Sequence, residues 1–256
     1  MRLLANYLIH EVDISETMAK GYQDREQKKI FVSVIIPVFN EEVTVGDIVT
    51  RTNKTLDHME DSYEVLVVDD GSDDRSAVIA KERNAIVIRS THQGKGFALR
   101  SGFRQAKGKM VVTLDADGSH KPEEIPLLLQ YLMENKADFV VGSRFADSEA
   151  NKTKIPKINR IGNRLFNNLT GYLTGVRVSD SQSGFRAIRA SLIMKMNLNS
   201  HGYEVESEML VKALRMGARI KETPISFDQR TVGNSKLDPL RDGIRILYAI
   251  ITSYLS

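Results

Sequence analysis

The stretch FVSVIIPVFNEE, residues 31–42, decides the fold, because a short apolar run leads directly into a polar turn. The same change recurs several times downstream, and each time the polar turn is followed by a segment with helical spacing. Strands this short and this continuously apolar are typical of a sheet covered by helices on both faces. The sequence therefore predicts an α/β domain whose central sheet is mostly parallel.

The expected elements alternate regularly in the first half of the chain. The strands are expected at Phe31–Ile36, Tyr63–Val68, Ala85–Ile88, Met110–Leu114 and Asp138–Val141, and the helices at Val43–Met59, Ser72–Arg83, Gly96–Ala106 and Pro122–Asn135. Ser72 or Asp73 is expected to cap its helix. Later in the chain the expected elements are a basic amphipathic helix within 145–180, strands at Phe185–Ile188 and Ile220–Phe227, and a helix at Val205–Met216.

The two ends of the chain differ from this main domain, which we assign to residues 30–237. Residues 1–29 are interpreted as an N-terminal arm and 238–256 as a C-terminal apolar helix. Asp238 and Pro239 are typical of an N-cap and a first helical residue. The apolar run is too short to span a bilayer by itself. Packing on the domain, pairing in a dimer, lying in a membrane interface and leading into a membrane span are all compatible with it.

The composition excludes several classes of function. The chain has 36 Lys and Arg against 33 Asp and Glu, a formal net charge of +3, so charge does not indicate a nucleic-acid partner. The absence of cysteine excludes disulfides, thiolate zinc sites and cysteine nucleophiles. The N-terminus lacks the pattern of a secretory signal. We expect a cytoplasmic protein, and the sequence does not determine its oligomeric state.

Acidic residues follow three of the expected strands, at Glu41, at Asp69 and Asp70, and at Asp115 and Asp117. In sheets of this kind, ligands bind beyond the carboxyl ends of the strands. Carboxylates gathered at one edge repel each other unless a cation is present, and their hard oxygens suit Mg²⁺ or Mn²⁺. The pair Asp115 and Asp117 is therefore the expected metal site.

A second candidate for phosphate contact is Gly94-Lys95-Gly96, directly before an expected helix. Its backbone amides and Lys95 could contact a phosphate, although a simple helix-start turn explains the pattern equally well. The glycine-rich phosphate loops of other nucleotide-binding folds are missing from the sequence.

Six motifs in order resemble those of family 2 inverting glycosyltransferases. Three of them look like the successive signatures of that family: VIIPVFNE at 34–41, VVDDGS at 67–72 and LDAD at 114–117. The other three resemble the dolichyl- and polyprenyl-phosphate sugar transferases within it, which include enzymes of the dolichol-phosphate mannose synthase type: GSRF at 142–145, DSQSGFR at 180–186 and RTVGNSKL at 230–237.

This resemblance implies a GT-A fold and an inverting transfer of a hexose, mannose or glucose, from a GDP- or UDP-sugar to dolichyl or polyprenyl phosphate. The basic run Lys152–Arg164, the apolar positions from Leu165 and the apolar end from Ile244 predict a peripheral enzyme at the cytoplasmic face of a membrane. The metal ligands that the resemblance implies are Asp115 and Asp117, with Ser119 at a position that can help to hold the ion. The residues expected at the nucleotide are Pro37, Phe39, Glu41, Val68, Asp70, Lys95 and Ala116.

The acceptor phosphate needs cationic partners more than it needs a base, because a phosphate is already a nucleophile at neutral pH. Arginine holds phosphate oxygens bidentately and stays charged. The expected acceptor residues are Arg144, Arg160, Arg164, Arg230 and Lys236, and Arg144 and Asp117 are the expected catalytic residues. An acceptor hydroxyl would instead need a base, for which Asp180 is the candidate.

Three other functions are associated with sheets of this kind or with this family. A sugar-1-phosphate nucleotidyltransferase would need a glycine-rich turn after the first strand, and residues 37–42 contain no glycine. A non-catalytic binding protein is disfavoured by the intact pair Asp115 and Asp117. A family 2 transferase that adds sugar to a saccharide hydroxyl is disfavoured only by the acceptor-side motifs, so it stays as the alternative.

Overall fold

A computed structural model describes residues 29–59, 61–146, 154–230 and 238–256, so the predicted arm up to residue 28 lies outside the described part. The strands are β1 (Val32–Val38), β2 (Tyr63–Asp69), β3 (Ile86–Arg89), β4 (Met110–Thr113), β5 (Phe139–Ser143), β6 (Arg186–Arg189) and β7 (Ile220–Pro224). The helices are α2 (Val45–Asp57), α3 (Ser76–Glu82), α4 (Lys95–Gln105), η1 (Pro122–Glu124), α5 (Ile125–Met133), α7 (Lys157–Thr174), α8 (Ala190–Ile193), α9 (Val205–Arg215) and α10 (Pro239–Leu255).

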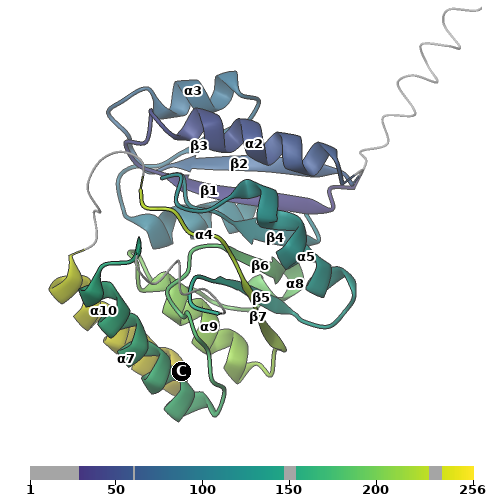
Figure 1. The fold of residues 1–256 in the computed structure, drawn as a ribbon. Helices are drawn as coiled ribbons and strands as arrows, with labels where there is room; N and C mark the ends of the chain where they lie inside the picture. The colour runs from purple at the N-terminus through teal and green to yellow at the C-terminus, as the bar shows by residue number, and fades with distance from the viewer. Residues whose placement is uncertain (1–28, 60, 147–153, 231–237) are drawn as a thin grey trace, which may run out of the picture.

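The strands form one seven-stranded sheet in the order β3-β2-β1-β4-β6-β5-β7 (Figure 1). The pairs β1–β2, β1–β4, β2–β3 and β5–β7 are parallel, whereas β6 is antiparallel to both of its neighbours, β4 and β5. The prediction of a mostly parallel α/β sheet is thus confirmed. The reversed strand β6 places the segment before it at the same edge as the ends of β4 and β5.

Helices cover both faces of the sheet, which explains the run of three apolar residues, Val34, Ile35 and Ile36, in β1. Val34 and Ile36 point into a core shared with α2 and α5, whereas Ile35, between them, points into a second core shared with α4 and α9. All three side chains are fully buried. Alternate residues of one strand therefore enter two cores, and the buried polar residue of β1, Ser33, is accommodated by a hydrogen bond to Glu64 at 2.6 Å.

The capping prediction is wrong. Helix α3 starts at Ser76, and its N-cap is Arg75. Ser72 and Asp73 instead tie the turns after β1 and β2 together: the Ser72 hydroxyl accepts from the Asn40 amide at 2.9 Å, and the Asp73 amide donates to Asn40 Oδ1 at 2.9 Å. These polar residues therefore fix the edge of the sheet where the ligand is expected.

Helices α7 and α10 lie side by side at one end of the molecule and pack on α9 (Figure 1). Phe166 of α7, Ile246 and Ile250 of α10 and Val211 of α9 form a small buried cluster. The Asp238 carboxylate accepts from the amides of Leu240 and Arg241, as the N-cap prediction requires. The C-terminal helix thus buries one of its faces against the domain.

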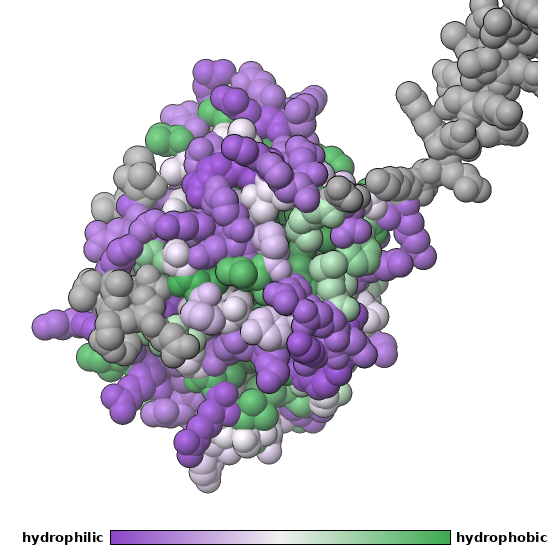
Figure 2. Space-filling model, turned by 45° about the vertical axis from the view of Figure 1, so that its right-hand side comes forward, coloured by the Kyte–Doolittle hydropathy of each residue, from purple (hydrophilic) through white to green (hydrophobic). Residues whose placement is uncertain are grey.

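The opposite faces of α7 and α10 expose large apolar side chains at helical spacing. On the side of the molecule seen in Figure 2 the surface is mostly hydrophilic, with apolar patches. None of the helices within the described residues has both the length and the apolar character to cross a bilayer. The exposed apolar residues of the two helices are Ile158, Ile161, Leu165 and Tyr172 on α7, and Leu240, Ile244, Tyr248, Ile251 and Leu255 on α10.

Candidate active site

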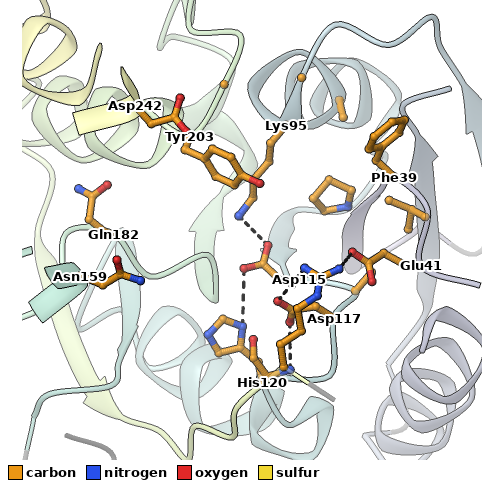
Figure 3. A pocket seen from close by; sticks show the side chains of 18 of the residues that line it. Phe39, Glu41, Lys95, Asp115, Asp117, His120, Asn159, Gln182, Tyr203 and Asp242 are labelled. Carbon is orange, nitrogen blue, oxygen red and sulfur yellow. Dashed lines mark hydrogen bonds and ion pairs between the residues drawn. The ribbon is translucent and has the colours of Figure 1, made fainter. Parts of the chain in front are cut away.

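A cavity of about 900 Å³ opens at the carboxyl edge of the sheet. Most of the residues predicted for the site line it, although they come from segments far apart in the sequence (Figure 3). They are Pro37, Phe39, Glu41, Asp70, Lys95, Asp115, Ala116, Asp117, Ser119, Arg144 and Arg230.

Three other predicted site residues, all within the described part of the chain, do not line this cavity. Val68 is fully buried in the core, and it is not among the lining residues. Arg160 and Arg164 lie on α7 but line neither this cavity nor its smaller neighbour. Their spacing of four residues places both on one face of α7, and this face does not line either cavity. Lys236 lies outside the described residues.

The far end of the cavity, beyond β1 and β2, carries an aromatic pair. The rings of Phe39 and His92 stack with centroids 4.0 Å apart at 22°. Asp70 organises the loop that holds His92: its carboxylate accepts from the amides of Gln93 at 2.9 Å and Gly94 at 2.7 Å, and from the Ser90 hydroxyl at 3.1 Å. Asp70 therefore shapes this end of the cavity as well as lining it.

The motif Gly94-Lys95-Gly96 forms a helix-start turn. The Gly94 amide donates to Asp70, and the Gly96 and Phe97 amides both donate to the carbonyl oxygen of His201, at 2.7 and 3.2 Å. Because those amides already have acceptors, the idea that they hold a phosphate does not fit this structure. Gly94 and Lys95 both line the cavity, and Lys95 brings its cationic side chain to it.

Lys95 lies between two carboxylates. Its ammonium is 2.6 Å from Asp115 Oδ1 (Figure 3). It is also 2.8 Å from Glu206 Oε1. Burial alone would lower the pKa of Lys95, but the two carboxylates outweigh it and raise that pKa well above its ordinary value. Burial would likewise raise the pKa of Asp115, and the charge of Lys95 holds it below its ordinary value instead. Lys95 and Asp115 are therefore both charged at neutral pH.

Asp117 and Glu41 share Arg230. The Arg230 guanidinium donates to Glu41 Oε1 in a close ion pair, and its other nitrogen lies 3.7 Å from Asp117 Oδ2. The Ser119 amide donates to Asp117 Oδ1 at 3.0 Å, which fixes the bend of the Asp-x-Asp motif. Arg230 thus connects the nucleotide motif after β1 with the acidic motif after β4.

His120 is a buried neighbour that the sequence did not single out. Its side chain is 2% exposed, and neither ring nitrogen has a hydrogen-bond partner among the described residues. Nδ1 lies 3.9 Å from Asp115 Oδ2, and the ring packs against Phe185 and Phe227. Burial lowers the pKa of His120, so the ring is neutral at physiological pH.

Arg144 is held by Asp180. Its Nε and Nη2 donate to the two carboxylate oxygens of Asp180 at 2.7 and 2.8 Å, and its backbone amide adds a third bond at 3.0 Å. The guanidinium also lies over the rings of Phe145 and Phe227. Burial would lower the pKa of Arg144, but the charge of Asp180 outweighs it and raises that pKa. Arg144 is thus a fixed, permanent cation.

The role considered for Asp180 as a base does not fit this arrangement. Its side chain is fully buried, both of its oxygens accept from Arg144, and it is not among the residues that line the cavity. A base must reach the proton that it removes, directly or through one water. Asp180 is therefore a positioning residue for Arg144.

A second, smaller cavity of about 250 Å³ lies between α7 and α10. Its walls are largely apolar, with Ile155, Ile158, Phe166 and Ile246 among them. It meets the large cavity at a polar junction, made by residues that line both: Lys95, Arg144, Asn159, Gln182 and Tyr203. The site thus consists of a large cavity with charged walls connected to a smaller cavity with largely apolar walls.

Four residues of the site were missed by the reasoning from the sequence: Asn159, Gln182, Tyr203 and Glu206. Gln182 lies within a quoted motif, but nothing in its spacing assigned it to a cavity. Glu206 is an acid on a helix face that is otherwise buried, a signal that could have identified it. Asn159 and Tyr203 carry no such signal, since only the packing of α7 and α9 around the sheet edge brings them here.

Comparison with known proteins identifies the family of the chain. Residues 33–196 match the model of glycosyl transferase family 2. A dolichyl-phosphate hexose transferase of Haloferax volcanii is 31% identical over 86% of this chain and 92% of its own. An undecaprenyl-phosphate 4-deoxy-4-formamido-L-arabinose transferase of Edwardsiella ictaluri is 34% identical over 87% of this chain and 67% of its own.

A solved structure supports the fold alone. Glucosyl-3-phosphoglycerate synthase of Mycobacterium tuberculosis, in complex with Mn²⁺, UDP and phosphoglyceric acid, superposes with a TM-score of 0.70 at 22% identity, over 88% of this chain and 78% of its own. The predicted GT-A architecture is thus confirmed. From the family match and the two relatives it follows that the chain belongs to glycosyl transferase family 2.

Proposed function

We propose that this glycosyltransferase moves a hexose, mannose or glucose, from a GDP- or UDP-sugar to a dolichyl or polyprenyl phosphate, with inversion at the anomeric carbon. The observation that carries the proposal is the polar junction between the two cavities. A lipid phosphate has a charged head on an apolar chain, and the junction offers Arg144 and Lys95 at the mouth of an apolar cavity. The activities of the two relatives support the same acceptor class.

The donor would occupy the large cavity. Its nucleoside would lie toward Phe39 and Asp70, and its diphosphate toward Asp115 and Asp117. A divalent cation, Mg²⁺ or Mn²⁺, fits there: these ions take one or two carboxylates and complete their shell with water and substrate phosphates. Within the described residues, no group of three acidic or histidine side chains forms a complete ligand set, in line with such a shared site. When bound, the ion would supply Lewis-acid stabilisation of the leaving diphosphate.

The acceptor phosphate would lie at the junction, with its chain in the smaller cavity. A phosphate oxygen would attack the anomeric carbon from the side opposite the nucleoside diphosphate. The new carbon–oxygen bond would form as the bond to the diphosphate breaks, and that diphosphate would leave with the electron pair. Arg144 would neutralise and orient the nucleophile, and no proton needs to be removed from it at neutral pH.

The alternative, transfer to a saccharide hydroxyl, has less support. That reaction requires a base near the acceptor, and Asp180 is committed to Arg144 by two hydrogen bonds. The apolar walls of the smaller cavity would also offer few partners to a saccharide, whose hydroxyls need hydrogen bonds when buried.

The deciding experiment is an assay of nucleotide-sugars with a polyprenyl phosphate and, in parallel, with water-soluble saccharides. Gly162→Leu should place a side chain in the smaller cavity, since a Cβ at Gly162 meets only ordinary contacts. We expect the KM for the polyprenyl phosphate to rise by about tenfold, the effect of losing the burial of roughly two methylenes, with the KM for the nucleotide-sugar unchanged. Asn168→Leu, on the exposed side of α7, is the matched control.

Two outcomes of this assay would count against the proposal. One is efficient transfer to a saccharide with none to the polyprenyl phosphate, which would favour the hydroxyl acceptor. The other is an equal rise in both KM values for Gly162→Leu, which would mean that the smaller cavity does not hold the lipid.

We also propose that the enzyme acts at the cytoplasmic face of a membrane, through the exposed apolar faces of α7 and α10. Each helix has one apolar face packed on the domain and a second one exposed, which burial in an interface would cover. The basic run predicted at 152–164 contributes less than its sequence suggests. Lys154 is paired with Asp228 at 2.7 Å, and Lys152 lies outside the described residues.

Sedimentation with anionic vesicles tests the membrane proposal. We expect the protein to sediment with vesicles, with a salt-resistant fraction that falls at least about tenfold in Leu165→Ser/Tyr248→Ser, since each change removes over 1 kcal/mol of burial. Val43→Ser/Met194→Ser is the control, because these side chains are similarly exposed but lie elsewhere. Equal losses in both double variants, or no sedimentation of the unmodified chain, would contradict the proposal.

A further inference from the structure

Gly184 lies against the carboxylate of Asp115, with no room for a side chain between them. A Cβ built on Gly184 would overlap Asp115 Oδ2 and lie 2.9 Å from both Cγ and Oδ1. The backbone of Gly184 does not require glycine, since its φ is not positive. Glycine is therefore required at position 184 for steric reasons, because the Asp115 carboxylate occupies the volume that a side chain would fill.

The Asp115 carboxylate cannot easily rotate or shift away from Gly184. Oδ1 is engaged by Lys95 at 2.6 Å, and the ring of His120 stands 3.9 Å from Oδ2. A methyl group at position 184 would have to rotate the carboxylate, and this rotation would break the contact with Lys95. Overpacking of this kind forces side chains off their preferred rotamers.

The backbone at Gly184 is fixed as well. The Thr113 hydroxyl donates to the Gly184 carbonyl at 2.7 Å, and the Gly142 amide donates to the Phe185 carbonyl at 2.9 Å. Thr113 belongs to β4 and Gly142 to β5, so both neighbours of β6 hold this point. Moving Gly184 away from Asp115 would break these bonds.

The same segment also holds the acceptor arginine. Asp180 binds Arg144, and the segment between Asp180 and Gly184 is braced by the buried guanidinium of Arg186, which donates to the carbonyls of Ser181 and Ser183, both at 2.7 Å. Residues 180–184 thus touch Arg144 at one end and Asp115 at the other. The segment is short and braced along its length.

We infer that Gly184 is a positioning residue for Asp115, and that residues 180–184 act as a rigid spacer that sets the distance between the donor carboxylate and the acceptor arginine. The second half of this statement rests on the proposed function, because it takes Arg144 as the acceptor residue. The first half does not, since it concerns only the contact between Gly184 and Asp115.

A double-mutant cycle on stability tests the contact. Gly184→Ala should lower the midpoint of thermal unfolding by roughly 3–5 °C in the wild-type background, the scale of a modest overpacking in a chain of this size. In the Asp115→Ala background the carboxylate is gone, and Gly184→Ala should cause no loss. Gly171→Ala is the control, because a Cβ there meets nothing closer than 3.5 Å. Equal losses from Gly184→Ala in both backgrounds would overturn the inference.

Binding of the nucleoside diphosphate with Mn²⁺, measured by calorimetry, gives the second readout. We expect Gly184→Ala to weaken binding at least about tenfold, and to add nothing to the loss caused by Asp115→Ala. Unchanged binding in Gly184→Ala would refute the positioning role. Neither measurement involves an acceptor, so a failure of the lipid-phosphate proposal would leave both results standing, and a failure here would leave that proposal intact.

Discussion

Removal of divalent cations with EDTA is expected to abolish sugar transfer, and added Mn²⁺ or Mg²⁺ to restore it. Asp117→Ala should lower kcat by at least about 10²-fold even with excess metal, the scale of one lost electrostatic stabiliser of the leaving group. The reason is that Asp115 and Asp117 lie on one bend at the cavity, where the diphosphate would lie. The measurement is the initial rate of transfer with each metal and with chelator.

Asp47→Ala serves as the control for the loss of an acidic side chain. Asp47 is an exposed residue of α2, away from the cavity, and it pairs only with Arg51 and not with any site residue in the described part. Its substitution should leave the rate unchanged. Full activity in chelator, or a loss for Asp47→Ala as large as that for Asp117→Ala, would show that the acidic motif does not act through a metal.

Arg144→Ala is expected to lower transfer to the lipid phosphate by about 10²–10³-fold, while the affinity for the nucleoside diphosphate stays within about threefold of the wild type. Arg144 stands at the junction of the two cavities, and the nucleotide motif after β1 lies elsewhere in the large one. Calorimetric titration with nucleoside diphosphate and kinetics with varied acceptor concentration separate the two effects.

Two further variants sharpen this test. Arg164→Ala removes an equivalent charge from the exposed side of α7 and should be nearly silent. Asp180→Asn keeps the shape of the side chain but removes the charge that fixes Arg144, so it should cause a smaller loss of the same kind. If Arg144→Ala weakens nucleotide binding as much as transfer, then Arg144 belongs to the donor site.

The fold could be predicted from the sequence because the composition of its strands indicates that both of their faces are buried. Val34, Ile35 and Ile36 are consecutive apolar residues, and only a strand buried on both faces needs such a run. The direction of β6 could not be predicted in the same way. The sequence of Arg186–Arg189 does not indicate whether the strand runs parallel or antiparallel to its neighbours. Its position between β4 and β5 depends on contacts with segments distant in the chain.

The donor side of the site was also accessible from the sequence, since Asp115 and Asp117 follow a strand and the edge rule applies to them. The acceptor side of the site was harder to predict from the sequence. Arg160 and Arg164 have the right charge, but the face of a helix that meets a cavity depends on how α7 packs on α9 and α10. Asn159, one residue before Arg160, lines the cavity instead.

The place of β6 in the sheet limits how this enzyme could be re-engineered by recombination. The strand that follows the acceptor motif is inserted between β4, whose end carries Asp115, and β5, whose end carries Arg144. A chimera that takes its C-terminal half from another family member would place a foreign central strand between β4 and β5 of the recipient. New acceptor preferences should therefore come from point changes on the facing sides of α7 and α10, and crossover libraries with a junction after β5 should yield mostly unfolded proteins.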